Sequence, residues 1–311
     1  MSRTRLSPAA VLTLAVLAAL PALAGGCSRA PLGLVGSRRT LTYCHGGGMA
    51  QTLDLYRPSS SGHAAPVLVD IHGGGWVAGD ATVTPASLDG DVERSLVDRG
   101  WVFVSINYRL APDHPWPAQI EDATCAIRFL RADALALHID PDRMAVMGAS
   151  AGGHLASLVG LAGNRPAFTG DDHRGQSAAV EAVVDLYGPT DLTSPDWASS
   201  PGIQILSRQT FGVAAGRDAP VLVAASPVTY VQPGAPPFLV VQGAEDRIVP
   251  PSQSRELVAR LDAAGDRATL IMVHNAGHGL VPRGRGPVSP PVVAVAASVV
   301  TFLTRVIPPT G

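Results

Sequence analysis

The pentapeptide Gly148-Ala149-Ser150-Ala151-Gly152 places a serine between two glycines. A serine on a tight strand-to-helix turn can act as a nucleophile, and larger residues at the glycine positions would collide within such a turn. The serine could equally be a small residue of an ordinary turn, because a chain with 33 glycines can produce this spacing by chance. The other residues of the chain must therefore decide whether Ser150 is reactive.

The two residue types that a nucleophilic serine requires follow it along the chain. Asp246 lies just past an apolar run of strand length, and His278 lies between two glycines after the last such run. A histidine takes the proton of the serine and a carboxylate orients the histidine, and Ser150, Asp246 and His278 stand in the chain order that a strand-to-helix elbow demands. Two alternatives stay open. Glu245 is the neighbouring acid, and His274 is the other candidate base, although it still belongs to the end of a strand.

A run of three glycines, residues 73–75, stands between His72 and Trp76 and could supply hydrogen-bond donors. Glycines can turn several backbone N–H groups toward one point, which is what a carbonyl oxygen needs when it becomes an anion during acyl transfer. The amide of Ala151, the residue after the serine, would add a further donor. The alternative is a flexible linker, but the run lies between a buried apolar segment and a tryptophan, which disfavours that interpretation.

Apolar runs of strand length alternate with stretches of helical periodicity along the chain. The expected strands are 39–44, 52–56, 66–71, 101–107, 144–147, 180–186, 238–242 and 268–273. The expected helices are 88–99, 118–137, 153–161, 252–264 and 292–306. This alternation predicts an α/β fold with a mostly parallel sheet and helices on both faces. The candidate residues all follow strands, at the sheet edge where ligands bind in such folds.

The stretch from about 190 to 237 is rich in proline, serine and glycine and shows the least regular pattern. It is too long for an ordinary connection between a strand and a helix. We expect it to form a partial cap over the site.

Six motifs together resemble a known family. They are HGGGW (72–76), INYRLAPDHPWPAQIEDA (106–123), GASAGGHLA (148–156), GPTDL (188–192), GAEDRIVP (243–250) and AGHGL (276–280). From about residue 53 onward the chain resembles the HGGG-type carboxylesterases of the α/β-hydrolase fold, which are related to hormone-sensitive lipase and include shorter feruloyl-esterase-like members. The resemblance implies an eight-stranded, mostly parallel sheet, a reduced cap, no metal and no cofactor.

The resemblance also implies roles for individual residues. The oxyanion donors of the family correspond to Gly74, Gly75 and Ala151. His72, Gly73, Trp76 and Tyr108 would line or support the substrate pocket, with Arg109 as a further support.

The implied activity is that of a serine carboxylesterase on a small-molecule ester. Two departures from the family affect finer expectations. Ala149 stands where family members often carry aspartate, and little sequence precedes HGGG, so we expect an open, shallow site that accepts short to medium acyl esters.

Two other functions remain as alternatives. One is an arylformamidase or another amide hydrolase on the same fold. The other is an inactive hydrolase fold that serves as a binding module, which is disfavoured because the chain keeps both Ser150 and His278.

The N-terminal residues indicate export. Two arginines precede the apolar stretch 11–20, and Ala22-Leu23-Ala24 forms a processing site, which predicts a signal peptide over 1–24. The alternative is a lipoprotein signal over 1–26, because LAGGC at 23–27 resembles the lipid-attachment box and would anchor the protein to a membrane through Cys27. Lipidation there would leave Cys44 and Cys125 as an even pair, whereas simple secretion would leave an odd thiol.

Composition bounds the remaining organisation. The chain has 311 residues, of which 46% are hydrophobic, and this suits one α/β-hydrolase domain over 38–311. Its net charge is −2 and no basic run exceeds two residues, so we expect no nucleic-acid partner.

Overall fold

The computed structural model describes residues 37–59, 63–217 and 219–308. The predicted signal peptide and Cys27 lie outside these ranges, so cleavage and lipidation stay predictions. Within the described ranges, no helix has both the length and the apolar character needed to cross a bilayer.

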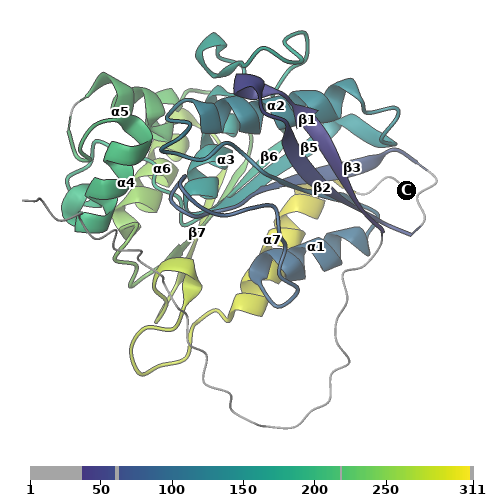
Figure 1. Ribbon diagram of the computed structural model, residues 1–311. Helices are drawn as coiled ribbons and strands as arrows, with labels where there is room; N and C mark the ends of the chain where they lie inside the picture. The colour runs from purple at the N-terminus through teal and green to yellow at the C-terminus, as the bar shows by residue number, and fades with distance from the viewer. Residues whose placement is uncertain (1–36, 60–62, 218, 309–311) are drawn as a thin grey trace, which may run out of the picture. The chain divides into compact units, whose positions relative to one another are not determined.

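An eight-stranded sheet forms the centre of the described chain (Figure 1). The strands are β1 (Ser37–Cys44), β2 (Gln51–Arg57), β3 (Ala65–Ile71), β4 (Val102–Ile106), β5 (Ile139–Ala149), β6 (Ala182–Leu186), β7 (Phe238–Gly243) and β8 (Ala268–Val273). Their order across the sheet is β1-β2-β4-β3-β5-β6-β7-β8. β2 pairs antiparallel with β1 and with β4, and the pairs from β4 to β8 are all parallel. The predicted mostly parallel, eight-stranded sheet is confirmed.

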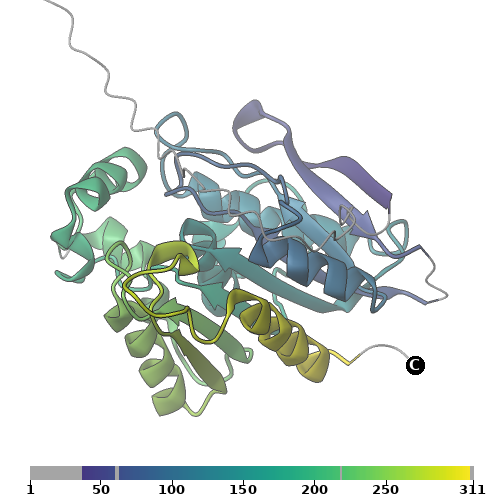
Figure 2. The ribbon, with the colours of Figure 1, turned by 90° about the horizontal axis from the view of Figure 1, so that it is seen from below.

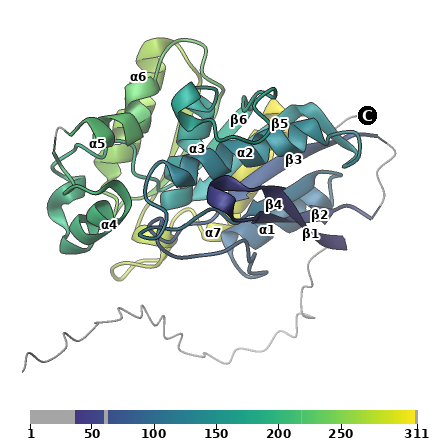
Figure 3. The ribbon, with the colours of Figure 1, turned by 45° about the horizontal axis from the view of Figure 1, so that its top comes forward.

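Helices cover both faces of this sheet, which is why its central strands are mostly apolar. The helices are α1 (Leu88–Val97), α2 (Ala118–Ala132), α3 (Ala151–Ala162), α6 (Pro251–Ala264) and α7 (Val292–Val306). α1 and α7 pack together on one face, as Figure 2 shows. α2, α3 and α6 bury their apolar residues in a second core on the other face (Figure 3).

The segment between β6 and β7 is partly helical, although its composition showed no regular pattern. It contains α4 (Pro201–Phe211) and α5 (Pro220–Ala225), seen in green in Figure 1. Both helices begin with proline, whose fixed φ angle suits the first helical position and whose missing N–H has no partner to lose there. Two of the prolines that obscured the pattern in the sequence therefore mark helix starts.

Two element boundaries differ from those predicted. α2 ends at Ala132 instead of continuing to residue 137, because the chain turns back there and His138 adopts a positive φ of 46°. β5 begins at Ile139 instead of residue 144, since Ile139 already pairs with Ala65 of β3. Polar residues in the first half of β5 hide this part of the strand from a search for apolar runs.

A disulfide joins Cys44 at the end of β1 to Cys125 in α2. The two cysteines are 81 residues apart in the sequence, and their Cα atoms lie 6.5 Å apart. The sequence alone left the pairing of these two thiols open.

Breaking this disulfide should lower stability substantially. Closing a loop of this length restricts the unfolded chain by about 4 kcal/mol, so a Cys44→Ala/Cys125→Ala variant should lose a free energy of unfolding of about that size. Urea denaturation of both proteins, with and without reductant, measures the difference. Reductant should lower the midpoint of the wild type and leave that of the double variant unchanged. An unchanged wild-type midpoint would show that the bond adds no stability.

Candidate active site

The candidate residues gather at the carboxyl end of the parallel strands. His72 to Trp76 follow β3, Ser150 follows β5, Asp246 follows β7 and His278 follows β8. Because these strands are parallel, their carboxyl ends meet at one sheet edge, where open α/β folds place their ligands. Residues separated by more than 200 positions are thereby brought to one place.

Ser150 forms a strained turn between β5 and α3. Its φ and ψ angles are 56° and −116°, and its backbone N–H donates to the Leu186 carbonyl at 2.8 Å. A Cβ atom on Gly148 would collide with the Gly152 backbone, and one on Gly152 would collide with the Ile71 carbonyl. The glycines on either side of the serine are therefore required by close backbone contact. A strained residue held in place by its surroundings is typical of functional sites.

A chain of two hydrogen bonds joins the serine, the histidine and the aspartate. His278 Nε2 lies 2.8 Å from Ser150 Oγ, and His278 Nδ1 lies 2.8 Å from Asp246 Oδ2. The carboxylate can only accept, so Nδ1 carries the hydrogen of the neutral ring. Nε2 is then free to accept the proton of the Ser150 hydroxyl.

The Asp246 carboxylate is buried and fixed by several donors. Oδ1 accepts from the backbone N–H groups of Ile248, at 2.8 Å, and Val249, at 3.0 Å. Oδ2 accepts from Nε2 of the Gln242 side chain at 3.2 Å. Oε1 of the same side chain accepts from Ser254 Oγ at 2.8 Å. With both oxygens occupied in this way, the carboxylate has one orientation toward His278.

The structure separates the alternatives that the sequence left open. The Glu245 side chain accepts from the Ala276 backbone N–H at 2.8 Å, so it braces the loop that carries the histidine. His274 is exposed, and its backbone pairs with Ser289. Asp246 and His278, and not these neighbours, complete the contact with Ser150.

The backbone of the glycine run turns so that a carbonyl group is hydrogen-bonded within the loop while two N–H groups are not. Gly74 and Gly75 have positive φ angles of 109° and 62°. The Gly74 carbonyl accepts from the N–H groups of Val77 and Ala78, at 3.2 and 3.1 Å. No hydrogen bond of the described residues uses the N–H of Gly74 or Gly75. The loop therefore keeps these donors for another acceptor.

The Ala151 amide is a donor of the same kind. Ala151 is the first residue of α3, and the first N–H groups of a helix have no partner within it. Partial positive charge at this helix end favours an anion beside Ser150. Gly73 lies where the glycine run meets the serine turn. A Cβ atom there would lie 2.9 Å from the Ala149 carbonyl and 3.5 Å from Ser150 Cβ.

His72 and Tyr108 hold the backbone of the glycine run through a stacked ring pair and hydrogen bonds. Their rings stack with centroids 4.2 Å apart. His72 Nδ1 donates to the Gly73 carbonyl at 2.7 Å, and the Tyr108 hydroxyl donates to the His72 carbonyl at 3.2 Å. Burial lowers the pKa of His72, which keeps this ring neutral. Arg109, expected as a further support, instead binds Asp122 of α2 through its side chain.

Trp76 is buried, with 2% of its surface exposed, and supports the loop from within the core. Its indole Nε1–H donates to Nδ1 of His154 at 3.3 Å, and Nε2–H of His154 donates to the Ala225 carbonyl at 2.7 Å. His154 thus joins the glycine loop, the serine helix α3 and α5. Burial lowers the pKa of His154 to about 4, so the ring stays neutral as both bonds require.

The buried His154 should make stability depend on pH. Its pKa falls from an ordinary 6.5 to about 4 on folding, so between these pH values the unfolded chain binds more protons. The contribution of His154 to the free energy of unfolding is complete above pH 6.5. It decreases by about 3 kcal/mol in total as pH falls through 4. Denaturant unfolding from pH 4 to 7 should therefore show a shallower rise in stability for His154→Gln than for the wild type.

The comparison must be made between variant and wild type at each pH, because another group acts in the opposite direction. Burial raises the pKa of Asp185 to about 6, and this group costs stability as pH rises from about 4 to 6. Parallel curves for the wild type and His154→Gln would show that folding does not lower the pKa of His154.

Tyr187 is part of the site but was not predicted. Its ring packs edge-on against His278, with centroids 5.1 Å apart, and its φ of 48° is strained. The available signal was its position directly after the strand at 180–186, at the same sheet edge as the other site residues. Gln242 was missed for a similar reason, because a supporting amide belongs to no short motif.

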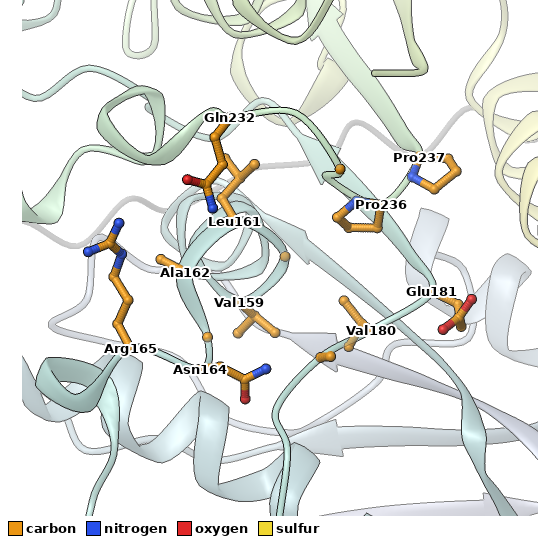
Figure 4. A pocket seen from close by; sticks show the side chains of 14 residues that line it. Val159, Leu161, Ala162, Asn164, Arg165, Val180, Glu181, Gln232, Pro236 and Pro237 are labelled. Atoms are coloured by element: carbon orange, nitrogen blue, oxygen red, sulfur yellow. The ribbon is translucent and has the colours of Figure 1, made fainter. Parts of the chain in front are cut away.

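A separate cavity lies at the opposite end of α3. It has a volume of about 520 Å³ and is lined in part by Asn164, Arg165, Glu181 and Gln232 (Figure 4). Residues 159–165 of α3 and the following turn form one wall, whereas Ser150 precedes the first turn of that helix. This cavity is therefore distinct from the site at Ser150.

The sheet order and the serine turn after β5 define the α/β-hydrolase fold. Solved structures with this arrangement include a truncated carbohydrate esterase from gut microbiota, which is 26% identical, with a TM-score of 0.73, 89% of this chain covered and 99% of the other. Another is Thermogutta terrifontis esterase 2 phosphoramylated by tabun, which is 25% identical, with a TM-score of 0.70, 91% of this chain covered and all of the other. The predicted fold is confirmed.

The family model BD-FAE matches residues 53–261, and the chain belongs to this family. Esterase LipC of Mycobacterium tuberculosis is 36% identical over 247 residues, which is 78% of this chain. The match covers 59% of LipC, so the chain spans little more than half the length of this curated relative. The predicted resemblance to carboxylesterases is thereby confirmed at the level of the family.

Proposed function

We propose that the protein is a serine carboxylesterase that hydrolyses short to medium acyl esters through an acyl-enzyme. The observation that carries this proposal is the hydrogen-bond chain from Asp246 through His278 to Ser150, with both bonds at 2.8 Å. The esterase names of LipC and of the two solved structures support the same reaction class.

In the first half of the reaction, His278 Nε2 removes the Ser150 hydroxyl proton while Oγ attacks the ester carbonyl carbon. The carbonyl oxygen becomes an anion and accepts hydrogen bonds from the amides of Gly74, Gly75 and Ala151. The imidazolium then gives its proton to the alcohol oxygen as the ester C–O bond breaks. The alcohol leaves, and the acyl group remains on Oγ.

In the second half, water enters the position that the alcohol left. His278 Nε2 takes a proton from the water as its oxygen attacks the acyl carbon. The bond between the acyl carbon and Ser150 Oγ breaks, the proton returns to Oγ, and the carboxylic acid leaves. Asp246 accepts from Nδ1–H throughout and stabilises the charged ring in both halves.

A substrate panel tests ester against amide hydrolysis. We expect purified protein to hydrolyse p-nitrophenyl acetate and butyrate with a much higher kcat/KM than N-formylanilide substrates. Preference for the formylanilide would assign the protein to the amide hydrolases, and no turnover of either would favour a binding module.

We further propose that the protein is exported. The signal pattern over 1–24 supports this, and so does the Cys44–Cys125 disulfide, since disulfides persist in oxidising compartments. Mass spectrometry of the mature N-terminus distinguishes the routes. A chain that starts at Gly25 indicates secretion, an acylated Cys27 indicates a membrane anchor, and an intact Met1 would contradict export.

A further inference from the structure

Leu206 of α4 lies against Gly75, the last residue of the glycine run. A Cβ atom on Gly75 would lie 2.9 Å from Leu206 Cδ1 and 3.0 Å from Cδ2, so the Leu206 side chain fills the space that a side chain at position 75 would take. Leu206 is half-buried, whereas the adjacent Ile205 is 57% exposed. The Leu206 side chain thus belongs to a wall beside one of the proposed oxyanion donors.

The position of this wall is fixed by the core. Ile203 and Thr210, one turn to either side of Leu206, are buried on the same face of α4. Phe211 packs against the Trp76 ring with centroids 5.3 Å apart. The Thr210 backbone carbonyl accepts from the backbone N–H of Trp116 at 2.8 Å. α4 is therefore anchored to the residue that follows the glycine run, and these contacts hold the backbone that carries Leu206.

The order of the strands tells which part of an ester meets Leu206. Across the sheet, β3 with the glycine run lies on one side of β5 and Ser150, and β7 and β8 with Asp246 and His278 lie on the other. The alcohol oxygen must face His278, because it receives its proton from that ring. The acyl group, which stays on Ser150, then extends away from His278 and toward the side of the glycine run.

We infer that Leu206 sets the upper limit on acyl-chain length. This inference rests on the proposed esterase function and assigns the acyl side of its site. The isobutyl group blocks the space beyond the oxyanion donors, so acetyl and butyryl groups fit and longer chains meet the wall of α4. The substrates implied are esters of short-chain acids, with the alcohol part on the His278 side unconstrained by this residue.

The test measures kcat/KM for p-nitrophenyl acetate, butyrate, hexanoate and octanoate with the wild type and Leu206→Ala. Removing three carbons from the wall should raise the octanoate-to-acetate ratio of kcat/KM at least about tenfold. Leu206→Phe should lower the butyrate-to-acetate ratio. Ile205→Ala is the matched control, since it makes the same kind of truncation on the exposed side of the helix and should leave the acyl profile unchanged.

A second series, acetate esters of different alcohols, separates the two sides of the site. Leu206→Ala should leave this alcohol profile within about twofold of the wild type. A change in the alcohol profile, or an unchanged acyl profile in an active Leu206→Ala protein, would overturn the assignment of Leu206 while the esterase proposal stands. Absence of ester hydrolysis that depends on Ser150 in the wild type would overturn both.

Discussion

Replacing Ser150 with alanine should lower kcat for ester hydrolysis by about 10⁶-fold. The variant keeps the oxyanion donors and the acyl wall, but no atom is left to form the acyl intermediate. KM should change little, because the hydroxyl contributes to bond formation and not to substrate binding. Steady-state kinetics on p-nitrophenyl butyrate, with protein purified free of host esterases, measures the loss.

Ser157→Ala is the matched control for this variant. Ser157 lies in the same helix, α3, and its hydroxyl donates to the buried Asp185 at 3.0 Å. Its removal should reduce stability by about 1 kcal/mol and leave kcat within a few-fold of the wild type. Comparable activity of Ser150→Ala and Ser157→Ala would place the nucleophile elsewhere.

Asp246→Asn should lower kcat by about 10⁴-fold without changing the fold. The asparagine has nearly the same shape, but one of its two terminal atoms becomes an NH₂ donor. If that group faces His278, the ring must present an unprotonated Nδ1 to it, and Nε2 then carries the hydrogen and cannot accept the Ser150 proton. Stopped assays over a long incubation are suited to a rate this low.

Glu245→Gln tests whether the neighbouring acid shares this role. The glutamine keeps an oxygen that can accept from the Ala276 N–H, so the loop that holds His278 stays in place and kcat should fall by less than tenfold. A loss from Glu245→Gln as large as that from Asp246→Asn would show that the acid was assigned to the wrong residue.

The fold was predictable because burial leaves a strong pattern in the sequence. β3 and β7 lie between two layers of helices, so every residue in them is buried and most of their residues are apolar. α4 and α5 were not predictable in the same way. Both start with proline in a segment rich in proline, serine and glycine. α4 is held in place by tertiary contacts such as that between Trp76 and Phe211, which no local pattern encodes.

For the site, the sequence identified the residue types and their order along the chain. The structure decided between candidate residues that are neighbours in the sequence. Asp246 and Glu245 stand side by side in one loop, and sequence gives little ground for choosing between two adjacent acids. The choice follows from backbone geometry, which points one carboxylate at His278 and the other at the Ala276 amide. Tyr187 and Leu206 were missed because packing, and not a motif, brings them to the site.

The most direct test of the account is the site at which a fluorophosphonate probe reacts. The tabun adduct of the Thermogutta esterase supports the use of an organophosphorus reagent. Peptide mass spectrometry of the treated protein should find one adduct, on Ser150, and labelling should slow by orders of magnitude in His278→Ala. An adduct on another residue, or labelling of Ser150 at the same rate without His278, would contradict the proposed site.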